Sequence, residues 1–196
     1  LSISFLFFTS LQAQEKQGAH WYFGPNLGIS FQSGMPDVIA QQELNTTNSI
    51  STIADSKGRL LFYSDGSLLF DKQGNVMPNS ASFSGARIST ILPKPNAPNR
   101  YYLVGINDGG DLWYTEIDMT LNNGLGEVVI AQTVLLANQV SPKLTAVLHT
   151  NGEDIWIITH EIASNNYISI QVTASGFEAP TRVGIGRAYC DRSATN

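Results

Sequence analysis

The side chains best suited to chemistry are two adjacent aromatic residues and the acidic residues just before them. Trp113 and Tyr114 lie in the segment 111–118, which is expected to form a strand, and Asp108 and Asp111 precede them. Neighbouring side chains of a strand point to opposite faces, and both rings are expected mainly to be core residues. The alternative is that one of the two rings is exposed. An exposed ring beside carboxylate and amide groups suits sugar binding. These four residues are therefore the candidate ligand-binding set.

Metal sites have less support in the sequence. The stretch "NDGGD" at 107–111 offers oxygen ligands that would suit calcium, but it lacks the regular spacing of an EF-hand or RTX loop, and a glycine-rich hairpin turn that needs no metal is the favoured interpretation. His149 and His160 flank one expected hairpin, in which His149 lies opposite Asp154 and His160 lies about 20 Å away. His20 adjoins the expected leader segment. No metal or cofactor site is assigned, and calcium at 107–111 stays an alternative.

Catalytic arrangements are also scarce. Glu153, Asp154 and Glu161 are the acidic residues that would serve a glycoside-cleaving pair of carboxylates. The sequence contains no nucleophile elbow, no Cys/His pair and no phosphate-binding loop. We therefore expect a protein without enzymatic activity. The alternative is a secreted carbohydrate-active enzyme, a glycosidase or lyase, for which Arg59, Arg87 and Arg100 are candidate cations.

A repeated short sequence predicts the strands that position these residues. The letters "ISTI" occur at 50–53 and again at 88–91, and "LTAV" at 144–147 has the same pattern. Each phrase is followed by a turn and then by an aromatic-rich strand, at 60–63, 101–104 and 155–158. The turns have suitable residues, such as Asp55 to Gly58 and the pair Asn151-Gly152. A third strand is expected at 67–71, 111–118 and 166–173, and a fourth segment at 74–77, 127–136 and 181–185.

The second strand of each unit is apolar on both faces, as in "IWII" at 155–158. A sheet with one solvated face would instead alternate apolar and polar residues. Repeated antiparallel units that are covered on both faces describe the blades of a β-propeller. We expect an all-β partial propeller with three to four visible blades, a fragment of a longer ring of about seven. Each phrase would begin an innermost strand. The alternative is a β-sandwich.

Three regions divide the chain. Residues 1–14 read as a secretory signal peptide that lacks its basic start, because the apolar run is too short to span a bilayer. Residues 19–185 hold the expected blades, with two further strands near 21–23 and 28–31. Residues 186–196 read as a truncated tail. This tail contains Cys190, the single cysteine of the chain, so no disulfide framework is expected.

Composition narrows the classes of partner. Only 14% of the 196 residues are charged and the net charge is −5, so nucleic acid is a poor candidate partner. The apolar content of 42% is sufficient for a folded core. The sequence thus predicts a folded, β-rich, extracellular protein without a membrane span in its mature part.

Several motifs resemble a known family. The stretches "HWYFGPNLGISFQSG", "IADSKGRLLFYSDG", "LWYTEIDMTLNNGLGEV" and "KLTAVLHTNGEDIWIITHE" are similar, in this order, to the N-terminal β-propeller of large secreted, gliding-motility-associated proteins of Bacteroidetes-type bacteria. The resemblance covers about residues 19–185. It implies type IX secretion, display at the cell surface, further domains in the same polypeptide and a role in adhesion to a surface protein or glycan. It supplies no catalytic residues, and the last ten residues depart from the family pattern.

Overall fold

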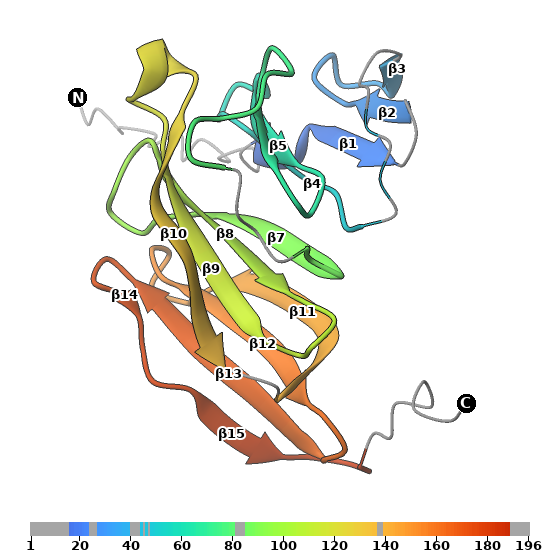
Figure 1. Cartoon of the computed structure of the whole chain (residues 1–196), viewed down its shortest axis with the longest axis vertical. Coiled ribbons are helices and arrows are strands. Elements are labelled where there is room, and N and C mark those ends of the chain that lie inside the picture. The colour runs from blue at the N-terminus through green and yellow to red at the C-terminus, as the bar shows by residue number, and fades with distance from the viewer. Residues whose placement is uncertain are drawn as a thin grey trace, which may run out of the picture.

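The computed structural model describes residues 16–23, 27–39, 44, 46, 48–80, 85–136 and 139–188. These residues form an all-β protein with four antiparallel sheets. In Figure 1 the first and second sheets lie side by side at the top, the third lies below them and the fourth lies at the bottom. Two short 3-10 helices, η1 (Lys16–Gly18) and η2 (Asn122–Gly124), accompany them.

Each sheet is a meander of consecutive strands, except that the last strand of the fourth sheet, β15, pairs with β13 and not with β14. The first sheet contains β1 (His20–Phe23), β2 (Leu27–Ser30) and β3 (Asp37–Ile39). The second contains β4 (Ser51–Ala54), β5 (Leu60–Ser64) and β6 (Leu69–Asp71). The third contains β7 (Ile88–Pro93), β8 (Arg100–Ile106), β9 (Leu112–Asp118) and β10 (Glu127–Leu136). The fourth contains β11 (Val140–Leu148), β12 (Ile155–Glu161), β13 (Asn166–Thr173), β14 (Gly176–Phe177) and β15 (Thr181–Gly184).

The strands expected from the sequence are confirmed with one exception. The three repeated phrases lie in β4, β7 and β11, the first strand of the second, third and fourth sheets. The predicted strand at 74–77 is wrong, because this segment makes only an isolated bridge between Val76 and Phe70. The expected Asp-x-x-Gly turn at 71–74 ends the pairing there. The Asp71 carboxylate accepts hydrogen bonds from the backbone amides of Gln73 and Asn75.

The first strands of successive sheets touch one another. β1 contacts β4, β4 contacts β7, and β7 contacts β11. The sheets are therefore stacked face to face along a line of first strands, and side chains from both sheets fill each gap. The core has three clusters accordingly, which contain Tyr22 and Tyr63 between the first and second sheets, Phe62 and Leu103 between the second and third, and Val104 with its neighbours between the third and fourth.

The two "ISTI" phrases face each other instead of repeating the same orientation. The Ser51 and Ser89 hydroxyls, at the same place in each phrase, lie 2.6 Å apart between the second and third sheets. Thr52 points the other way and donates to the backbone carbonyl of His20 in β1. A shift of one residue moves every side chain of a strand to its other face. The two phrases therefore share a sequence, but the same positions in them do not point in the same direction along the series of sheets.

Candidate functional site

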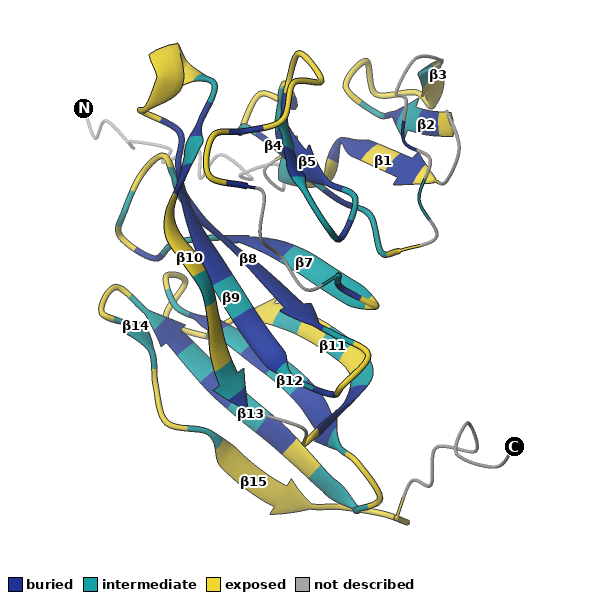
Figure 2. Ribbon diagram, viewed as in Figure 1, coloured by how far each residue is buried: buried dark blue, intermediate teal, exposed yellow. Residues whose placement is uncertain are grey.

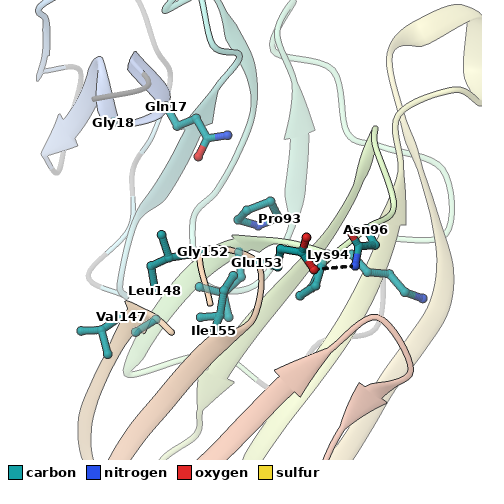
Figure 3. Close-up of a pocket in the computed structure, with 13 residues that line it drawn as sticks. Gln17, Gly18, Pro93, Lys94, Asn96, Val147, Leu148, Gly152, Glu153 and Ile155 are labelled. Atoms are coloured by element: carbon teal, nitrogen blue, oxygen red, sulfur yellow. Dashed lines mark hydrogen bonds between the residues drawn. The ribbon is translucent and has the colours of Figure 1, made fainter. Parts of the chain in front are cut away.

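A groove of about 790 Å³ opens at one end of the third and fourth sheets. It lies between the turn that follows β7 and the turn that follows β11 (Figure 3). Its apolar floor includes Leu92, Ala146 and Ile155, and its rim includes Gln17, Lys94, Asn96 and Glu153. An apolar floor with a few polar groups at the rim is the usual character of a binding groove.

Both turns that border the groove are held by internal hydrogen bonds. In the first, the amide of Ala97 donates to the Lys94 carbonyl, and Asn96 adopts a left-handed φ of 53°, which asparagine tolerates. In the second, the Asn151 carboxamide oxygen accepts from the amides of Glu153 and Asp154. The rim groups are thus fixed by their own backbone, and Asn96 donates to Glu153 across the groove over 3.2 Å.

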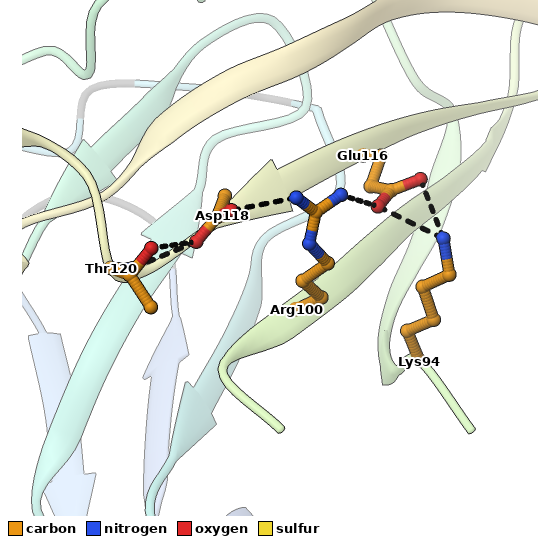
Figure 4. Close-up of polar contacts among 5 residues, drawn as sticks. All are labelled: Lys94, Arg100, Glu116, Asp118 and Thr120. Carbon is orange, nitrogen blue, oxygen red and sulfur yellow. Dashed lines mark hydrogen bonds and ion pairs between the residues drawn. The ribbon is translucent and has the colours of Figure 1, made fainter. Parts of the chain in front are cut away.

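A buried ionic network supports the wall of the groove (Figure 4). Glu116 on β9 is only 2% exposed and accepts from Lys94 at 3.1 Å and from Arg100 at 2.8 Å. Arg100 continues to Asp118 at 2.9 Å, and Asp118 accepts from the hydroxyl and the amide of Thr120. Lys94 is the cationic residue among the described residues that line the groove, so the network fixes the positive charge at its rim.

The charges of this network are stabilised by their partners. Hydrogen bonds from Thr120, together with Arg100, lower the pKa of Asp118 below its ordinary value. Burial alone would lower the pKa of Lys94, but its hydrogen bonds to Glu116 and Tyr102 raise it overall. Lys94 therefore stays protonated near neutral pH. It acts as a fixed charge at the groove and not as a proton donor.

The structure does not bring the four sequence-predicted ligand residues together. Trp113 is fully buried in the core between the second and third sheets, so it offers no face to a ligand. Tyr114 points to the other side, as alternation predicts, and its ring packs 4.4 Å from that of Phe177. Asp108 is exposed and lies 3.5 Å from Arg87.

The segment 107–111 forms a hydrogen-bonded turn. Asn107 accepts from the amide of Asp111, and its carboxamide donates to the Asp111 carboxylate at 2.9 Å. Gly110 supplies the positive φ of 77° that the turn requires. Within the described part of the chain, no group of three or more acidic, histidine or cysteine residues is placed to hold a metal ion. This turn and the groove are at opposite ends of β8, about 23 Å apart.

The candidate carboxylates of the enzymatic alternative are also separated. Glu153 and Asp154 precede β12, whereas Glu161 ends it, which places them about 23 Å apart. Glu161 is held by Arg182 and Asn166. His149 donates its backbone amide to the Asp154 carbonyl, as the predicted hairpin requires, and His160 lies at the far end of the same strand pair.

The groove itself was not predicted from the sequence. Its two turns were expected, but Asn96 and Glu153 are 57 residues apart, and no local pattern shows that they meet. The proline-rich run from Pro93 to Asn99 is the one local signal, because it marks a turn too rigid and too long for a minimal hairpin.

No protein-family model, curated protein or solved structure matches this chain. Among the residues that the structure describes, no helix has the length and apolar character needed to cross a membrane.

Proposed function

We propose that this chain is a non-enzymatic binding module of a secreted or cell-surface protein, and that it holds a segment of a partner protein in the groove between the third and fourth sheets. The observation that carries the proposal is the groove, whose apolar floor lies between two hydrogen-bonded turns. Leu148 at its edge is 65% exposed. An apolar surface of this kind, rimmed by polar groups, fits a partner's apolar side chain.

A protein partner suits the groove better than a sugar. None of its lining residues in the described chain is aromatic, and flat aromatic rings are the usual platform for a sugar. The rim instead offers Lys94, Asn96 and Glu153, which can position a peptide backbone or a charged side chain. The enzymatic alternative gains no support from the separated carboxylates.

The sheets themselves are proposed to be consecutive blades of a β-propeller. Contacts between the first strands of neighbouring sheets, in chain order, support this proposal. The two sheets at the ends of the series each leave one apolar face open: Trp21 and Val38 on the first are 53% and 72% exposed, and Tyr167 and Val183 on the fourth are 46% and 48% exposed. Figure 2 shows the exposed surface of β15. We propose that further sheets of the same polypeptide cover these faces and complete a ring.

The location is proposed from the sequence. The expected signal segment 1–14 lies outside the described residues, as does the tail from 189 onwards with Cys190. The resemblance to gliding-motility-associated proteins suggests type IX export and adhesion. A module of this kind would present its hairpin turns to a surface partner.

A library of displayed peptides tests the proposed function. Binders selected on the full chain are measured against Leu148→Glu and Glu153→Lys, which alter the edge and the rim of the groove. Asp108→Lys, at the opposite end of the third sheet, serves as the charge-matched control. We expect the groove variants to weaken binding at least tenfold, about 1.4 kcal/mol, and the control to retain it. The proposal is wrong if no peptide is selected, or if the selected peptides bind both groove variants as tightly as they bind the parent chain. A glycan array run in parallel identifies sugar binding instead.

A further inference from the structure

The groove between the third and fourth sheets runs along the free edge of a strand. β11 is the outermost strand of the fourth sheet and pairs there with β12. Three consecutive residues of β11, Ala146, Val147 and Leu148, line the groove (Figure 3). Successive side chains of a strand point to opposite faces, so a surface that touches all three follows the edge of the strand. The groove therefore gives access to the backbone of β11.

The pairing of β11 with β12 shows which backbone groups face this edge. The amide of His149 donates to the Asp154 carbonyl, and the register continues without a shift through Leu148 and Ala146. Hydrogen-bonded and non-hydrogen-bonded pairs alternate along antiparallel strands. Leu148 and Ala146 therefore occupy non-hydrogen-bonded positions, and their N–H and C=O groups point away from β12. Each of these two residues offers one donor and one acceptor at the groove.

The opposite side of the groove has no such pair of groups. In β7 the amide of Lys94 donates to the Arg100 carbonyl, so the same alternation turns the backbone of Pro93 away from β8. Proline has no amide hydrogen. At Pro93 the edge of β7 can accept a hydrogen bond but cannot donate one, and β11 is the edge that can pair with an added strand.

The rim of the groove keeps one negative charge. Lys94, the cationic residue of the described lining, shares its charge with the Glu116 carboxylate. Glu153 is exposed in the turn that follows β11, accepts from the neutral carboxamide of Asn96 and forms no ion pair with any described residue. A lysine or arginine of a partner would complement this carboxylate.

We propose that the groove binds a partner segment of extended backbone, which pairs as an added strand with the free edge of β11 and places a basic side chain against Glu153. The inference rests on the proposed function and specifies the form of the partner. Residues opposite each other in paired strands turn their side chains to the same face. Two partner residues at i and i+2, opposite Ala146 and Leu148, thus point to the floor of Leu92 and Ile155. Strand addition with alternate side chains held below is an established mode of peptide recognition.

A single strand fits this edge better than a second folded copy of the chain. β7 contacts β11 beside the groove, and the turns after β7 and β11 border it on two sides. The edge of another sheet would bring its neighbouring strands against these turns. A flexible segment between domains or at the end of a partner chain avoids this obstruction.

The peptide acetyl-RGLTLGR-amide, titrated into the full chain labelled for NMR, tests the pairing. It has two leucines at i and i+2, and an arginine at each end places one beside Glu153 in either strand direction. We expect saturable shifts of the Ala146 and Leu148 amides. N-methylation of both leucine amides should weaken binding about tenfold or more, because these amides face β11, and N-methylation of the threonine should not. No saturable shift, equal losses, or a loss with N-methylated threonine alone overturns the inference, whereas the peptide library decides the proposed function separately.

Variants of the chain test the two parts of the inference. Glu153→Gln should weaken the arginine peptide about two- to fivefold, the range of an exposed ion pair, and reduce its advantage over acetyl-EGLTLGE-amide. Asp108→Asn removes an exposed carboxylate away from the groove and should leave both affinities unchanged. An unchanged preference in Glu153→Gln refutes the basic side chain.

Ala146→Pro removes one donor from the edge of β11 and no hydrogen bond to β12. It should weaken the arginine peptide about tenfold, with the urea midpoint as the check on folding. Full affinity in a folded Ala146→Pro chain refutes the strand pairing. If this variant does not fold, the N-methylated peptides decide the same point on the parent chain.

Discussion

Replacing Glu116 by glutamine tests whether the buried network stabilises the third sheet. The substitution keeps the shape of the side chain and removes the charge that Lys94 and Arg100 share. Breaking a fully buried ion pair costs about 3–5 kcal/mol. Here the Lys94 and Arg100 side chains are 19% and 42% exposed, so water compensates part of the loss. We therefore expect the free energy of unfolding to fall by about 2 kcal/mol.

Urea unfolding followed by tryptophan fluorescence measures this change. With a slope of about 1–3 kcal/mol per molar urea, a loss of about 2 kcal/mol moves the midpoint by roughly 1 M. Glu178→Gln is the control, because Glu178 is exposed, and it should stay within about 0.5 kcal/mol of the parent chain. An unchanged slope in both variants shows that stability, and not compactness, has changed.

A double-mutant cycle that combines Glu116→Gln with Lys94→Met measures the interaction free energy between these two side chains, apart from their contacts with other residues. Because the two side chains contact each other directly, the double variant should be less destabilised than the sum of the single variants by about 0.5–3 kcal/mol. The interpretation is refuted if Glu116→Gln costs less than about 0.5 kcal/mol, or if the two single effects simply add.

Three more predictions concern the core and its pH response. A Cβ atom at Gly105 would lie 2.5 Å from the Trp113 ring, so Gly105→Ala should lower the free energy of unfolding by about 1–3 kcal/mol through overpacking, and an unchanged urea midpoint would contradict this. Ser89→Ala leaves the buried Ser51 hydroxyl without its partner at 2.6 Å and should cost about 1 kcal/mol, whereas replacing both serines by alanine should cost less than twice that. Because the pKa of Asp118 is lowered in the folded chain, its stabilising contribution is present above about pH 4 and disappears as the pH falls through the lowered folded value. Melting temperatures measured across this range should fall less steeply for Asp118→Asn than for the parent chain.

Some of the fold follows directly from local sequence. The strands around Tyr101, Ile155 and Tyr167 were expected because alternating and continuous apolar runs end at turn residues, and these signals act over a few neighbouring positions. The Asp-x-x-Gly turns belong to the same class, since one carboxylate binds the amides that follow it. The prediction of a strand around Val76 was wrong. An apolar pair beside a turn does not ensure that the edge of a neighbouring strand is free to pair with it.

Other features depend on which face of a strand meets which sheet. Alternation predicted that Trp113 and Tyr114 point apart, but it did not show that the Trp113 side is buried by the second sheet and the Tyr114 side by Phe177. For the same reason, the sequence did not show that the two "ISTI" phrases have opposed orientations. A shift of one residue in the pairing turns every side chain of a strand to the other face of its sheet, and the sequence of the strand stays the same.

The sequence alone determined that this chain is built from repeated antiparallel strands joined by well-formed turns, since both depend on residues only a few positions apart. The tertiary structure decided where binding surfaces arise. Lys94 meets Glu116 across 22 residues and Asn96 meets Glu153 across 57, and the groove exists only when the third and fourth sheets pack together. Long-range contacts of this kind depend on the packing of whole sheets, and no single stretch of residues specifies them.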